Sequence, residues 1–138
     1  MKQKPLLLIV EDDLLLAETM INKFISVGFK VELAPDGYAA LKYLETGRIP
    51  QIILLDILLP KTNGFDILSA IKKDDTLKQI PVIIASNLDS DKDVNRGYSL
   101  GAGDYIVKSN LSLNDLVQKV TFLMNKSSHG RSFLAHNK

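Results

Sequence analysis

Carboxylates follow two apolar runs of this sequence at the point where each run ends. Asp12 and Asp13 come shortly after Leu6–Val10, and Asp56 comes directly after Ile52–Leu55. If the three acids converge, two carboxylates about 4 Å apart repel by roughly 4 kcal/mol at an effective dielectric constant near 20. A hard divalent cation with oxygen ligands, such as Mg²⁺, relieves that repulsion. The sequence therefore predicts a metal site built on Asp12, Asp13 and Asp56.

A hydroxyl group and an ammonium group follow two further apolar runs. Ser86 comes after Val82–Ala85, and Lys108 comes after Tyr105–Val107. An aspartate is a poor nucleophile toward an anionic phosphoryl group unless a metal and an ammonium group neutralise the phosphoryl oxygens. Lys108 supplies such a positive charge, and Ser86 can donate a hydrogen bond to a phosphoryl oxygen. This set of residues predicts that Asp56 accepts a phosphoryl group as an acyl phosphate.

The elements that would position these side chains are five short apolar runs separated by segments of helical spacing. Three of the runs do not alternate with polar residues, which is typical of a parallel sheet covered on both faces. Capping patterns at Ser90 and Ser112 predict the starts of two helices. The rhythm predicts an α/β fold, with five parallel strands, right-handed crossovers and helices on both faces. In such sheets the ligand crevice lies beyond the carboxyl ends of the strands, where the residues above fall.

The bulk composition is that of one globular domain. The chain has 138 residues, a formal net charge of +1 with mixed signs, and no cysteine. We expect no direct nucleic-acid or membrane partner, since no basic stripe is present, and disulfides and thiolate metal sites are excluded. The first apolar run is too short for a signal peptide, and no run approaches the roughly 20 apolar residues of a membrane span. We therefore expect a soluble cytoplasmic protein.

The composition of the sequence changes after Asn125. Residues 126–138, KSSHGRSFLAHNK, are mostly polar and contain a glycine. We predict one domain over residues 4–125, with its last helix over 112–125. We interpret 126–138 as a polar tail, a linker stub or a remnant of the expression vector.

Four segments, taken in order, resemble the receiver domain of two-component response regulators of the chemotaxis-regulator-like type. They are VEDD at 10–13, LLDILLPKTNG at 54–64, PVIIAS at 81–86 and GAGDYIVK at 101–108. The resemblance covers about residues 4 to 125 and implies a flavodoxin-like (βα)5 fold with strand order 2-1-3-4-5. It also implies Mg²⁺-dependent phosphorylation of Asp56 by a phosphohistidine on a histidine kinase or a histidine phosphotransfer domain, with Mn²⁺ as a substitute metal. Such a domain assists its own phosphorylation and dephosphorylation but is not a turnover enzyme.

The resemblance assigns roles to the acids. Asp12 and Asp13 form an acid pair, in which Asp13 binds the metal directly and Asp12 acts largely through water. Asp56 is both a metal ligand and the phosphoacceptor, and the backbone carbonyl of Leu58 is a further ligand. Glu11 is expected to be a solvated neighbour without a role.

The resemblance also implies a phosphate grip and a conformational switch. Ser86 and Lys108 hold the phosphoryl group, and Ser86 with Tyr105 forms the switch, in which the aromatic ring turns inward. A downstream protein then reads the change on one surface. That surface comprises residues about 90–102, the strand at 104–107 and the helix at 112–125. Because this helix has no row of arginines, we expect a monomer or a weak phosphorylation-dependent dimer.

Three features depart from the family pattern. Ser109 stands where the family usually has a proline preceded by a cis bond, so the Lys108–Ser109 bond is either trans, with a different approach of the lysine, or cis and strained. Asn63 replaces the common aspartate before a glycine. Leu58 and Leu88 occupy positions that tune hydrolysis of the phosphoryl group. Since neither side chain can orient a water molecule, we predict a long-lived phosphorylated form.

Three other functions are less consistent with the sequence. A haloacid-dehalogenase-like phosphatase also uses a strand-end aspartate, but it needs a second acid two residues later, where this chain has Leu58. A pseudo-receiver that docks without being phosphorylated is the stronger alternative, because Ser109 alters the phosphate-binding loop. A role as a kinase or phosphotransfer protein is disfavoured, because the only histidines, His129 and His136, lie in the tail.

Overall fold

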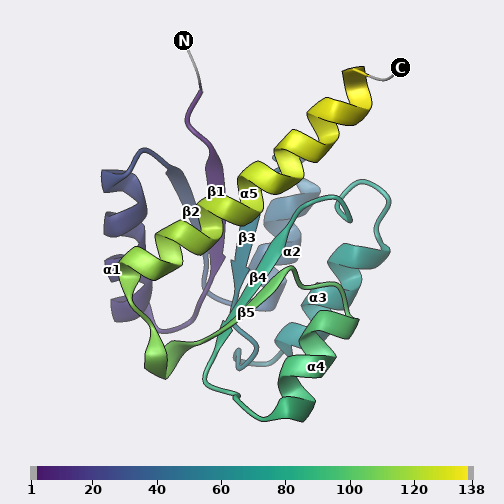
Figure 1. The fold of residues 1–138 in the computed structure, drawn as a ribbon. Coiled ribbons are helices and arrows are strands. Elements are labelled where there is room, and N and C mark those ends of the chain that lie inside the picture. Colours follow the sequence, from purple (N-terminus) through teal and green to yellow (C-terminus); the bar gives the residue numbers. More distant parts are fainter. Residues whose placement is uncertain (1–2, 137–138) are drawn as a thin grey trace.

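Five parallel strands form a single sheet in the computed structural model, which describes residues 3–136 and the side-chain surroundings of residues 3–127. The strand order is β2-β1-β3-β4-β5, which confirms the predicted order and the flavodoxin-like α/β fold (Figure 1). The strands are β1 (Leu6–Val10), β2 (Lys30–Ala34), β3 (Ile52–Leu55), β4 (Val82–Ser86) and β5 (Asp104–Val107). They agree with the predicted apolar runs to within one residue at each end.

Within the described range, an α-helix follows each strand. The helices are α1 (Leu14–Ser26), α2 (Gly37–Glu45), α3 (Gly64–Lys73), α4 (Asp91–Ser99) and α5 (Leu113–His136), and a short 3₁₀ turn, η1 (Lys108–Asn110), precedes α5. Both predicted caps are present: the Ser90 hydroxyl accepts a hydrogen bond from the Asp93 N–H, and the Ser112 hydroxyl accepts one from the Asp115 N–H. None of the helices among these residues combines the length and the apolarity needed to cross a membrane.

The helices cover both faces of the sheet, as predicted. One hydrophobic cluster joins the strands to α1 and α5 through residues such as Phe24 and Leu116. The opposite cluster joins the strands to α2 and α3 through Leu44 and Leu68. Helix α4 lies on this second face, where Gly97 packs against Ile84. The central strands are therefore buried on both sides, which explains their unbroken apolar runs.

The last helix is longer than the sequence predicted. We expected it to end at Asn125, but α5 continues to His136, and Figure 1 shows its final turns extending past the sheet. No proline interrupts residues 113–136. A single interior glycine, Gly130, costs only about 1 kcal/mol relative to alanine, so the helix can pass through it. The domain boundary placed after Asn125 stays a prediction.

Candidate functional site

Strand register places Glu11 and Asp56 beside each other at one end of the sheet. Val10, the last residue of β1, pairs with Leu55, the last residue of β3. The pairing continues one residue further, because the Asp56 N–H donates to the Val10 carbonyl at 3.0 Å. The side chains of the two acids therefore leave neighbouring strands at the same level.

Successive side chains of a strand alternate between the two faces of the sheet, and this alternation determines the face to which each charged side chain at the strand ends projects. Three buried residues of the cluster under α1 and α5 stand two positions before a charged residue; they are Ile9, Leu54 and Ile106. Side chains two residues apart in a strand point to the same face. The charged residues that follow them, Glu11, Asp56 and Lys108, therefore project on the α1/α5 side of the sheet edge.

Lys108 bridges two buried carboxylates. Its Nζ donates to Asp56 Oδ2 at 2.7 Å and lies 2.5 Å from Glu11 Oε1. The exposed fractions of the three side chains are only 13% for Lys108, 2% for Glu11 and 5% for Asp56. Burial alone would lower the pKa of Lys108, but the hydrogen bonds to Asp56 and Glu11 and the negative charges of these two acids together raise that pKa. Lys108 is therefore held in its charged form.

Glu11 occupies an unfavourable place for a charge. Burial raises the pKa of the Glu11 carboxyl group above its ordinary value, and the nearby charge of Asp56 adds to this, while the hydrogen bond with Lys108 opposes it. The Asp13 N–H also donates to Glu11 Oε2 at 3.0 Å. A buried carboxylate in such surroundings needs positive charge nearby to remain ionised.

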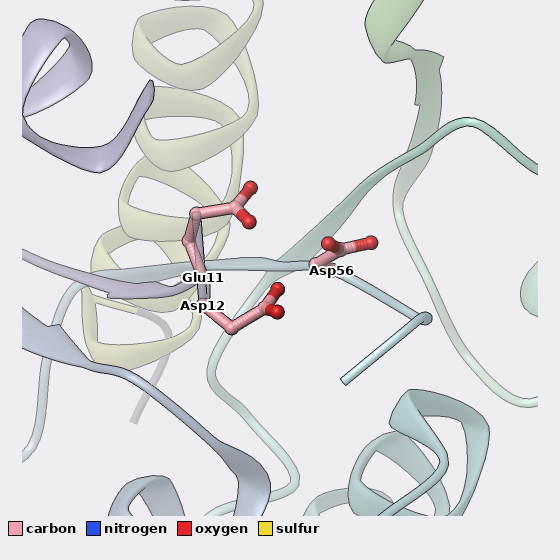
Figure 2. Close-up of side chains that lie close together, drawn as sticks. All are labelled: Glu11, Asp12 and Asp56. Carbon is pink, nitrogen blue, oxygen red and sulfur yellow. The ribbon is translucent and has the colours of Figure 1, made fainter. Parts of the chain in front are cut away.

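A third carboxylate, that of Asp12, completes an acidic cluster with Glu11 and Asp56. One carboxylate oxygen from each of these residues lies within 4.8 Å of the others. Figure 2 shows the three side chains turned toward a common space, two from the end of β1 and one from the end of β3. Asp12 is exposed, so the cluster opens to solvent at this residue.

The two acids that the structure brings close to Asp56 are Glu11 and Asp12, one residue before the predicted pair. Asp13 is exposed and lies outside the cluster, because it is the N-cap of α1, where its Oδ1 accepts from the Leu16 N–H at 3.1 Å. Glu11 belongs to the cluster instead, so the expectation that Glu11 is a solvated neighbour was wrong. The strand alternation carried the information, since Glu11 follows Ile9 by two residues as Asp56 follows Leu54.

The loop after β3 lies against Asp56. The Leu58 N–H donates to Asp56 Oδ1 at 3.2 Å, and Leu58 is 57% exposed. Gly64 begins α3, and an added Cβ there would collide with the Asp56 carbonyl oxygen and would lie 2.5 Å from the Ile57 Cα. Only a glycine permits α3 to start so close to the segment that carries Asp56.

Ser86 and Tyr105 meet on the opposite face of the sheet. Ser86 is fully buried and follows Ile84 by two residues, on the α2/α3 side. The Tyr105 hydroxyl donates to the Leu88 carbonyl at 2.6 Å, and the Leu88 N–H donates to Ser86 Oγ at 3.2 Å. Burial and the charge of Asp93 raise the pKa of Tyr105, and its hydrogen bond with Ser86 opposes this. The structure thus brings the two predicted switch residues together, with the tyrosine ring turned toward the Ser86 loop.

The loop after β5 delivers Lys108 without a cis bond. Residues 3–136 include no cis peptide bond, so the bond between Lys108 and Ser109 is trans. The chain turns through η1 directly at Lys108. Of the two geometries expected for a loop without proline, the structure has the trans one, and the lysine still reaches Asp56.

Known proteins match this chain over most of its length. Residues 7–121 match the response regulator receiver domain. A probable methanogenesis regulatory protein of Methanothrix harundinacea, FilR2, is 38% identical over 122 residues, which cover 83% of this chain and 78% of that protein. The chain spans about half the length of two transcriptional regulators that it also matches, RpaA of Synechocystis (50%) and DltR of Streptococcus agalactiae (53%).

Two solved structures are similar in sequence as well as in fold. The Mn²⁺-bound form of response regulator Rcp1 is 29% identical with a TM-score of 0.75. The phosphorylated cyanobacterial phytochrome response regulator RcpA is 32% identical with a TM-score of 0.76. Each comparison covers 88% of this chain and 92% of the other. The strand order, the cluster at the strand ends and these matches lead to one assignment: the chain belongs to the receiver domain family of two-component response regulators.

Proposed function

We propose that this receiver domain accepts a phosphoryl group on Asp56 from the phosphohistidine of a histidine kinase or a histidine phosphotransfer domain. The observation that supports this most directly is the position of Asp56. It is 5% exposed at the end of β3, bonded to a lysine and close to two further carboxylates. In this proposal the domain is a signalling phosphoacceptor and not a turnover enzyme. Its expected cytoplasmic location stays a prediction.

The transfer exchanges one bond for another. A carboxylate oxygen of Asp56 forms an O–P bond while the N–P bond of the donor phosphohistidine breaks, and the electron pair of that bond stays on the imidazole nitrogen. Asp56 thereby loses its own charge but gains a phosphoryl group carrying about −1.5 to −2 charges. Lys108 is already 2.7 Å from Asp56 Oδ2 and is therefore placed to form an ion pair with the phosphoryl group. Ser86 supplies a hydroxyl donor from the neighbouring strand.

The charges of the site suit a divalent cation. Three carboxylates contribute −3 and the ammonium group +1, which leaves −2 within a cluster whose oxygens approach to within 4.8 Å. We assign Glu11, Asp12 and Asp56 as the residues that hold Mg²⁺ or Mn²⁺, with the Leu58 backbone carbonyl as a further ligand; Asp13 is not among them. A bound metal would neutralise phosphoryl oxygens and so ease attack by a carboxylate. The Mn²⁺ in Rcp1 is consistent with this choice of metal.

The response to phosphorylation would pass through Ser86 and Tyr105. A phosphoryl group on Asp56 attracts the Ser86 hydroxyl, which is bonded to the loop that carries Leu88. Because the Tyr105 hydroxyl is bonded to the Leu88 carbonyl, a shift of this loop changes the position of the ring. A downstream protein would detect the change on the surface formed by α4, β5 and α5, and the domain would act as a monomer or a weak phosphorylation-dependent dimer.

The lifetime of the phosphoryl group should be long. Leu58 and Leu88 follow Asp56 and Ser86 by two positions, and their side chains carry no group that can position a water molecule for attack. We expect the acyl phosphate to persist for minutes or longer after the phosphodonor is removed. Decay within seconds would contradict this expectation.

Intact-mass measurement after incubation with acetyl phosphate and Mg²⁺ tests the proposal. The wild type should gain a single phosphoryl group, and chelation of the metal should prevent the gain. Asp56→Asn should gain none, and Asp12→Asn should require more Mg²⁺. Asp13→Asn is the matched control: it removes an acid that lies outside the cluster, keeps a good N-cap residue and should behave as the wild type.

A pseudo-receiver that docks without phosphorylation is the alternative. It is disfavoured because Lys108 reaches Asp56 even though the bond to Ser109 is trans. A folded wild type that gains no phosphoryl group under these conditions would support the pseudo-receiver instead.

A further inference from the structure

A contact between α4 and the first turn of α3 lies apart from the Ser86 and Tyr105 pair. The guanidinium carbon of Arg96 in α4 is 4.4 Å from the centroid of the Phe65 ring in α3. Phe65 is only 2% exposed, whereas Arg96 is an exposed residue. The guanidinium group therefore lies over a buried ring and shields it from solvent, in a cation–π contact.

Phe65 is attached closely to the segment that carries the phosphoacceptor. The residue before it, Gly64, has its Cα packed against the backbone of Asp56 and Ile57. The Gly64 N–H donates to the Ile57 carbonyl at 2.8 Å, and Asn63 Oδ1 accepts from the Phe65 N–H at 2.8 Å. A displacement of the Asp56 backbone must therefore be shared by the first turn of α3.

Helix α4 has few other anchors. It is a polar helix in which Gly97 is the only buried residue. An added Cβ on Gly97 would lie 2.6 Å from Ile84 Cδ1 and 3.0 Å from Tyr105 Cδ2, so the helix rests there on β4 and on the ring of the predicted switch. Arg96 precedes Gly97 and points to Phe65. Gly97 thus lies against the ring of Tyr105, while its neighbour Arg96 contacts Phe65, which is joined to the phosphoacceptor segment through Gly64.

We propose that Arg96 is a positioning residue that fastens α4 to the phosphoacceptor segment through Phe65. Helix α4 then responds to the state of Asp56 by a second route, in parallel with the route through Tyr105. This inference rests on the proposed function, because the state in question is phosphorylation of Asp56. Arg96 lies outside the site, and in this inference it sets how strongly a change at Asp56 alters the position of α4.

Hydrogen exchange of the α4 amides, measured by mass spectrometry with and without phosphorylation, tests the inference. Arg96→Gln removes the contact, and Lys92→Gln removes an equal charge from an exposed position of the same helix as the matched control. Without phosphorylation, the α4 amides of Arg96→Gln should exchange roughly two- to fivefold faster than those of the wild type. This factor corresponds to the free energy typical of one exposed cation–π contact. The change in α4 exchange on phosphorylation should fall to less than about half of the wild-type change, while Lys92→Gln matches the wild type.

Phe65→Leu gives a second, independent variant. It should raise α4 exchange as Arg96→Gln does, and the double variant should exchange no faster than the more affected single variant, because both remove the same contact. Wild-type exchange in Arg96→Gln, or an equal effect of Lys92→Gln, would overturn the inference. So would an α4 helix in the wild type that does not change on phosphorylation. Failure of Asp56 to gain a phosphoryl group, seen in the intact mass of the same samples, would instead overturn the proposed function.

Discussion

Replacing Lys108 by methionine should reveal how strongly this lysine stabilises the unphosphorylated site. The substitution leaves Glu11 and Asp56 buried without the ammonium group that both contact at 2.5 and 2.7 Å. Removing one partner of a buried ion pair typically costs about 3–5 kcal/mol. At about pH 8 without metal, we expect the free energy of unfolding to fall by roughly this amount, a large part of the 5–15 kcal/mol typical of a domain.

The loss should shrink as the pH falls or as Mg²⁺ is added. Burial raises the pKa of Glu11, and the hydrogen bond from Lys108 opposes this rise, so the pKa of Glu11 must rise further in Lys108→Met. Between the ordinary carboxyl pKa and that higher value, the folded state holds a proton that the unfolded state has released. The free energy of unfolding therefore increases as the pH falls through this interval. Mg²⁺ acts in the same direction, because it binds the folded cluster.

Urea denaturation at about pH 8 and about pH 5.5, each with EDTA and with saturating Mg²⁺, measures these effects. Lys72→Met is the matched control. The Lys72 ammonium group is also partly buried, but it donates to the backbone carbonyls of Lys78 and Ile80 and not to acids. Its loss should destabilise the protein without this response to pH or Mg²⁺. Wild-type stability of Lys108→Met at about pH 8 without metal would refute the charge argument.

Three further substitutions test other parts of the site. Asp13→Ala should lower the free energy of unfolding by about 1 kcal/mol through loss of the α1 cap, with Mg²⁺ affinity unchanged by fluorescence or calorimetric titration. Gly64→Ala should destabilise by about 2 kcal/mol or more in urea denaturation, since the new Cβ meets the backbone of Asp56; wild-type stability would mean that α3 can shift freely. Tyr105→Phe should cost about 1 kcal/mol for the lost hydrogen bond to a backbone carbonyl and should keep Asp56 phosphorylation by intact mass; loss of the adduct would place the hydroxyl in the transfer step.

The fold could be predicted because the apolar runs and the segments of helical spacing between them indicated the same architecture. Unbroken apolar runs required a sheet covered on both faces, and strand-end polar residues had to meet at one edge. This reasoning found Asp56, Ser86 and Lys108, whose positions depend only on where a strand stops. Tyr105, which pairs with Ile84 across the sheet, came instead from the resemblance to receiver domains.

The acid pair was harder to predict because it depends on the residue at which β1 ends and the residue at which α1 begins. Glu11 still follows the alternation of β1, whereas Asp13 has left the strand and caps α1. Three consecutive acids look alike in a linear reading, and only the alternation from Ile9 separates the buried one. Contacts such as that between Arg96 and Phe65 could not be predicted, because they join residues far apart in the sequence through the packing of two helices.

The two faces of the sheet carry different residues of the proposed mechanism. Glu11, Asp56 and Lys108 continue the alternation of β1, β3 and β5 toward α1 and α5, whereas Ser86 in β4 and Tyr105 in β5 project toward the opposite face. Under the proposed function, we therefore expect substitutions in α4 and on its face of the sheet to change which partner protein binds, while the acids and the lysine stay as they are. With this arrangement, the residues proposed for phosphoryl transfer can be kept during evolution while the partner-binding surface changes. Protein engineers can likewise exchange the residues of one face of the sheet separately from those of the other.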